Sequence, residues 1–192
     1  MPRTELDQRS GSASTWARCV LLTGVLVGVA DYAIGFGIFV ALFGRPLLGV
    51  FQAPAAGVLG LAAFRGGLRT AALGTLLHFV IAVVWALVFA FVYRRWPTLR
   101  RTVARASGLV FASAAAGAIV WLVMNNVVAP LGRGRPEPFG TPLFWAVLLG
   151  HLCFVGLPLV WGTRHFAPHV ADSGKAAAMD SAPEQKPRAA AT

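Results

Sequence analysis

The sequence predicts an all-α, polytopic membrane protein, with four transmembrane helices in an antiparallel bundle and a short extra helix between the first two. Hydrophobic residues make up 57% of the 192 residues and charged residues only 12%, which is about half the charged fraction of a soluble domain. The hydrophobic residues are also gathered in four long runs. Each run can supply the roughly 20 residues that a helix needs to cross a bilayer.

The four transmembrane helices are predicted at about residues 19–43, 70–93, 107–130 and 142–163, within a membrane domain of residues 17–166. Residues 1–16 form a polar segment in front of them. Small residues before Asp31 resemble a signal-peptide cleavage site, but the apolar run continues to Phe43. That is well beyond the roughly 7–15 apolar residues of a cleavable signal, so we expect the first helix to be retained.

Two further segments are predicted outside the spans. Residues 54–64 are expected to form a short interfacial or re-entrant helix, because Pro54 suits the first turn of a helix and the remaining length, roughly 15 Å, is too short to cross. Residues 167–192 are rich in Ala, Pro, Ser and mixed charge. They bury too little apolar surface to order themselves, which predicts a disordered C-terminal tail.

The basic residues predict the orientation of the chain. The net charge is +10, and most Lys and Arg residues lie in the N-terminus, the connection from Arg94 to Arg105 and the C-terminus. The positive-inside rule then places both termini in the cytoplasm. The charge does not indicate nucleic-acid binding, because no basic face interleaved with readout residues is present. The expected partner is the lipid bilayer.

Asp31 lies near the middle of the first predicted helix, where a carboxylate costs roughly 2.5–3.5 kcal/mol to insert. Gly24, Gly28 and Gly35 lie seven and three residues before it and four after it, on the same helical face. A stripe of glycine lets a second backbone approach closely, so we expect these glycines to pack helices and Asp31 to face the bundle interior.

Four more polar residues are candidates within the predicted spans: His78, Asn125, Asn126 and His151. His78 has Gly74 and other small residues on its face, which predicts an inward orientation and a packing role for Gly74. In antiparallel helices, His78 and Asn125 would lie roughly 10–12 Å below the outer boundary, with Asp31 and His151 within about two turns of that layer. One polar cluster of Asp31, His78, Asn125 and His151 is therefore a hypothesis.

Two roles are consistent with such a cluster, namely ligand binding and helix packing. Ionisable residues at depth in a membrane are functional candidates by default, which predicts binding of a proton, an ion or a small polar ligand. Alternatively, the side chains hydrogen-bond between helices and only fix the packing. No nucleotide-binding, nucleophile-elbow or zinc-protease motif occurs in the sequence. We therefore expect no enzyme activity, no metal and no cofactor.

Two alternative functions remain at this stage. His78 and His151 lie on different helices and fit the axial ligation of a haem, which would make the chain a haem- or quinone-binding redox subunit. The glycine faces also fit docking to another membrane protein, which would make it an assembly or interaction protein. A transport role would favour a homo-oligomer, since four helices leave little room for a gated path.

Three segments resemble a family of small bacterial four-helix integral membrane proteins without an assigned activity. They contain the sequences "LHFVIA" from Leu77, "MNNVVAPL" from Met124 and "GHLCFVGLP" from Gly150. The resemblance covers residues 20–166 and implies four membrane helices in a bacterial inner membrane. It does not indicate any particular activity. The polar N-terminus, the C-terminal extension and Pro54 depart from the family pattern. The matching positions are Asp31, Gly66, Gly67, Gly74, His78, Phe79, Asn125, Pro130, His151, Gly156 and Pro158.

Overall fold

The computed structural model describes residues 3–133 and 136–168, and within these ranges the regular structure is helical, with no strand. Four helices of the described chain are long and apolar enough to cross a membrane: Ala13–Leu42, Gly67–Arg95, Ala106–Leu131 and Pro142–Phe166. The predicted all-helical chain with four long apolar helices is confirmed. The predicted tail lies, from residue 169 onward, outside the described residues.

Three of the four long helices contain a widened π-helical segment. Helix α1 (Arg3–Gly35) continues into η1 (Phe36–Leu42), α6 (Ala106–Val123) continues through η3 (Met124–Val128) into α7 (Ala129–Arg133), and α8 (Pro142–Gly150) continues through η4 (His151–Val155) into α9 (Gly156–Phe166). Helix α4 (Gly67–Arg95) is α-helical throughout. Asn125 and His151 therefore both lie in π-helical segments, which occur frequently at functional sites.

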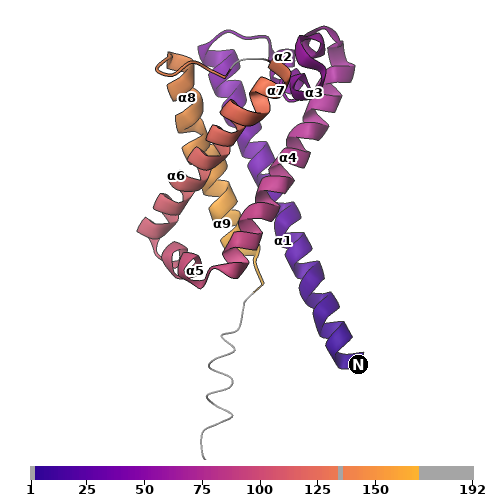
Figure 1. Cartoon of the computed structure of the whole chain (residues 1–192), viewed down its shortest axis with the longest axis vertical. Helices are drawn as coiled ribbons and strands as arrows, with labels where there is room; N and C mark the ends of the chain where they lie inside the picture. The colour runs from indigo at the N-terminus through magenta and orange to yellow at the C-terminus, as the bar shows by residue number, and fades with distance from the viewer. Residues whose placement is uncertain (1–2, 134–135, 169–192) are drawn as a thin grey trace, which may run out of the picture.

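Short helices close the two ends of the molecule. Helices α2 (Leu47–Gln52) and α3 (Ala56–Leu59), with the 3-10 turn η2 (Gly60–Arg65), connect α1 to α4. They lie at the same end as α7, whereas α5 (Pro97–Ala104) lies at the opposite end, between α4 and α6 (Figure 1). In place of the single short helix expected at 54–64, the structure has α3 followed by η2. A further helix, α2, precedes them, and Pro54 lies between α2 and α3.

Hydrogen bonds tie these short helices to the long ones. Gln52, buried at the end of α2, donates from Nε2 to the Gly67 carbonyl at 3.0 Å and to Thr70 Oγ1 at 3.2 Å. At the other end, Arg100 Nη1 donates to the Tyr93 carbonyl at 3.2 Å and to the Arg94 carbonyl at 2.7 Å. The two bonds from Arg100 satisfy carbonyl groups in the last turn of α4, which lack partners within the helix.

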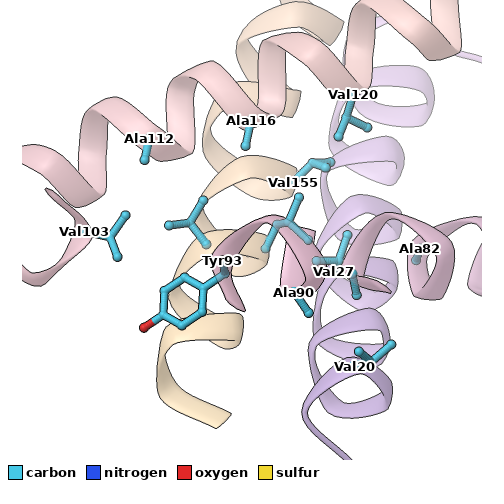
Figure 2. Packing of buried hydrophobic residues seen from close by; sticks show 13 residues of the cluster. Val20, Val27, Ala82, Ala90, Tyr93, Val103, Ala112, Ala116, Val120 and Val155 are labelled. Carbon is cyan, nitrogen blue, oxygen red and sulfur yellow. The ribbon is translucent and has the colours of Figure 1, made fainter. Parts of the chain in front are cut away.

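The main core consists largely of small and branched side chains. They come from α1, α4, α5, α6, η4 and α9. Figure 2 shows Ala112, Ala116 and Val120 pointing from α6 toward the side chains of the other helices. Leu159 and Val160 of α9 are almost fully buried in the same cluster. Alanine at every fourth position lets the helices approach closely, which favours packing between membrane helices that gain little from the hydrophobic effect.

Candidate functional site

Two glycines of α1 bring α4 close enough to form a site between the two helices. A Cβ atom added to Gly24 would lie 2.8 Å from the Cα of Val83, and one added to Gly28 would lie 2.6 Å from the ring of Phe79. Because no side chain of α1 occupies this space, α4 packs directly on the α1 backbone. His78, the residue next to Phe79, then reaches the carbonyl oxygen of Gly28.

His78 contacts α1 through both of its ring nitrogens. Its Nε2 lies 3.0 Å from the Gly28 carbonyl oxygen, and its Nδ1 lies 3.8 Å from Oδ2 of Asp31. Since a carbonyl oxygen only accepts hydrogen bonds, Nε2 carries a proton. The second distance is longer than a hydrogen bond. The distance between Nδ1 and Asp31 Oδ2 is therefore that of an ion pair, and the two atoms would have to move closer together to form a hydrogen bond.

The Gly28 carbonyl thereby limits the protonation states of the Asp31–His78 pair. With Nε2 protonated, Nδ1 either is a bare acceptor on a neutral imidazole or carries a second proton on an imidazolium. One proton between Nδ1 and the Asp31 carboxyl leaves the pair with no net charge, whichever of the two groups holds it. The loss of that proton leaves one negative charge, and the gain of another leaves one positive charge.

Aromatic rings surround the imidazole of His78. Tyr32 stacks on it with 3.9 Å between ring centroids and 26° between planes, and Phe79 meets it edge-on at 5.5 Å. Phe51 of α2 and Phe36 of η1 extend this aromatic cluster next to Tyr32. The His78 side chain is consequently 12% exposed, whereas that of Asp31 is 29% exposed. The protein itself thus covers Asp31 less completely than His78.

The remaining predicted packing glycines differ in what they contact. A Cβ at Gly74 would overlap the Phe51 carbonyl oxygen and lie 3.3 Å from the Ala55 nitrogen. Gly74 thus admits the backbone of the α2–α3 segment against α4. A Cβ at Gly35 would meet only Val50, at an ordinary contact distance of 3.6 Å. The close approach to α4 involves Gly24 and Gly28 rather than the whole glycine stripe.

Asn125 and His151 have other partners in the structure. Asn125 Oδ1 accepts a hydrogen bond from the Glu137 backbone nitrogen at 3.0 Å, in the connection before α8. His151 Nδ1 lies 2.9 Å from the Val147 carbonyl oxygen of its own helix. Within the described ranges, no hydrogen bond or ion pair joins either residue to Asp31 or His78. The structure brings together two of the four residues that were expected to form one cluster.

The described residues contain no group of three or more His, Cys, Asp or Glu side chains that could hold a metal ion. A haem ligated by His78 and His151 would require both imidazoles to face one space. Their recorded hydrogen bonds are to Gly28 of α1 and to Val147 of α8, so nothing in this arrangement directs them toward a common ligand.

Two residues beside the candidate site residues were not predicted from the sequence. Tyr32 follows Asp31, and its position within a predicted span was the only sequence feature that could have indicated it. Its stacking on His78 depends on the rotation of α4 against α1, which the sequence does not give. Its hydroxyl also donates to Thr75 Oγ1 at 3.4 Å. Glu137 was overlooked because it lies in a Pro-rich connection, and only the folded chain brings it to Asn125.

The fold and the Asp31–His78 pair define a class of protein, namely an all-helical chain with four helices able to cross a membrane and an ionisable pair between the first two. No family model, no curated protein and no solved structure matches this chain. The resemblance to small bacterial four-helix membrane proteins therefore stays a prediction that depends on the motif residues alone.

Proposed function

We propose that this chain is a non-enzymatic, multi-pass protein of a bacterial inner membrane that holds an exchangeable proton at the Asp31–His78 pair. In this proposal the four long helices cross the membrane as an antiparallel bundle with both termini in the cytoplasm. The basic connection that contains α5 then lies on the cytoplasmic side, and α2, α3 and α7 lie on the outer side. The positive-inside rule supports this orientation.

The hydrogen bond between His78 Nε2 and the Gly28 carbonyl is the observation that carries the proposal. It leaves Nδ1 facing the carboxyl of Asp31, so that one proton makes the pair neutral. In hydrocarbon a net charge of either sign costs free energy, which favours the state with one proton.

NMR of the histidine ring nitrogens in protein reconstituted in lipid nanodiscs tests this proposal. We expect the His78 spectrum to show a proton on Nε2, which bonds to the Gly28 carbonyl, and the Nδ1 signal to change when Asp31 is replaced by Asn. His151 is an internal control, because its recorded hydrogen bond is within its own helix. A His78 spectrum that is identical in the wild type and in Asp31→Asn would show that the two groups do not share a proton.

The redox alternative has an independent test. A haem-binding subunit would give a Soret band that disappears in His78→Ala and in His151→Ala. We expect purified protein to show no such band, because the two imidazoles bond to carbonyls of different helices. A Soret band sensitive to both substitutions would replace the proton-holding role with electron transfer.

A further inference from the structure

A second polar site lies at the end of the molecule where α7 and the start of α8 are found (Figure 1). It is a cavity of about 410 Å³ between α6–η3 and the connection that leads into α8. Volumes of this size fit small organic ligands. The residues that carry the argument are Trp121, Asn125, Asn126, Glu137, Phe139 and Phe144.

The polar side of the cavity is held in place by several hydrogen bonds around Glu137. Its Oε1 accepts from Thr141 Oγ1 at 2.8 Å, and its backbone nitrogen donates to Asn125 Oδ1 at 3.0 Å. Thr141 in turn accepts from the Phe144 nitrogen at 3.0 Å as the N-cap of α8. A carboxylate offers about four acceptor positions, so Glu137 can bond to Thr141 and to a donor on a ligand together.

The cavity also has aromatic lining residues. Trp121 and Phe144 are 5% and 7% exposed and meet edge-to-face with 4.7 Å between ring centroids. Phe139 packs on Phe144 at 5.0 Å and is itself 80% exposed at the rim. The faces of aromatic rings attract cations, and their area binds apolar groups.

We propose that this cavity binds a small organic cation, namely an amine with an apolar body. The ammonium group bonds to the Glu137 carboxylate and to the side-chain oxygen atoms of Asn125 and Asn126, while the apolar body packs against Trp121 and Phe144. The Glu137 carboxylate is the charged side chain among the described residues that line the cavity, which favours a cation over an anion there. This inference does not depend on the role of the Asp31–His78 pair.

Calorimetric titration of the full chain in detergent, with three probes of matched size, tests the proposal. The probes are 2-phenylethylammonium, 2-phenylethanol and 3-phenylpropionate. We expect the ammonium compound to bind at least about tenfold more tightly than the alcohol, which corresponds to about 1.4 kcal/mol, and the carboxylate compound to bind most weakly. Because all three comparisons use the wild-type chain, they do not depend on the folding of any variant.

Glu137→Gln locates the binding site. We expect it to remove the preference for the ammonium compound and to leave binding of the alcohol unchanged. Glu5→Gln makes the same change in charge near the start of α1, at the far end of the molecule (Figure 1), and should change neither. Failure of the ammonium compound to bind, equal binding of all three probes, or a preference that survives Glu137→Gln would each overturn the proposal.

Discussion

The contact between α1 and α4 and the contact between α6 and the η4–α9 segment use glycine for opposite purposes. At α1, Gly24 and Gly28 make room for Val83 and for the Phe79 ring, and the imidazole of His78 reaches the Gly28 carbonyl in the same place. At α6, a Cβ on Gly117 would lie 2.7 Å from the Cα of Leu152 and overlap the His151 carbonyl oxygen. At Gly28 the first contact admits a side chain beside the candidate site, although at Gly24 it also brings the Val83 backbone close. The second contact brings two backbones together.

The difference shows that a glycine stripe does not by itself indicate function. Backbone-to-backbone packing leaves no space in which a side chain could change its protonation or bind a ligand. A glycine that faces a polar side chain from the other helix does leave such a space. Substitutions in the two contacts should therefore differ in the size and in the kind of their effects.

Gly156→Ala should have the largest effect. A Cβ at this position would overlap the Ser113 carbonyl oxygen and lie 2.9 Å from the Gly117 nitrogen. Since neither backbone atom can move without separating the two helices, we expect a loss of about 3 kcal/mol in the free energy of unfolding. Thermal unfolding in detergent measures it. Gly49→Ala, where an added Cβ has no neighbour within 4 Å, is the matched control and should leave stability unchanged or slightly raised.

Gly28→Ala should have a smaller effect, about 1 kcal/mol on stability, because the added Cβ would meet the outer atoms of the Phe79 ring, which can turn aside. Its larger consequence is expected at His78, since the Phe79 ring and the neighbouring imidazole would shift together. The NMR signals of the His78 ring nitrogens should change. If Gly28→Ala were as destabilising as Gly156→Ala, the distinction between the two contacts would be wrong.

A double-mutant cycle of Asp31→Asn and His78→Gln measures the coupling within the pair. We expect a coupling energy of about 1 kcal/mol, because residues in contact depart from additivity while distant ones do not. The matched cycle of Asp31→Asn with His151→Gln should give no coupling, since no recorded polar contact joins those two residues in the described chain. Equal coupling in the two cycles would contradict the assignment of the site.

Ser113→Ala should have the smallest effect. The Ser113 hydroxyl is buried, and no hydrogen-bond partner is found for it. Removal of a buried hydroxyl without a partner is expected to leave stability within about 0.5 kcal/mol of the wild type or to raise it slightly. Thr75→Ala, which loses bonds to the Ala71 carbonyl and to Tyr32, should cost more. The reverse order would show that the polar groups of the α6 contact matter as well.

Some local features of the fold escaped prediction for identifiable reasons. Helix α5 (Pro97–Ala104) was not foreseen because it lies in a connection that contains several arginines, which was interpreted only as an orientation signal, although Val103 is fully buried. The helix expected at 54–64 is preceded by α2, whose end is fixed by the hydrogen bonds of Gln52 to the start of α4. The position of α5 and the end of α2 both depend on contacts with residues that are distant in the sequence or on the opposite side of a turn.

The sequence by itself determined that the chain has four helices long and apolar enough to cross a membrane, because the thickness of a bilayer sets the length of an apolar helix residue by residue. It also identified Asp31 and His78 as candidates, since an ionisable residue in such a run is costly wherever the neighbouring helices lie. Only the tertiary structure decided that Asp31 pairs with His78 while Asn125 bonds to Glu137. Which side chains meet depends on the order, rotation and tilt of the helices. Side-chain packing determines the order, rotation and tilt of the helices, and the pattern of hydrophobic residues along a single helix does not predict them.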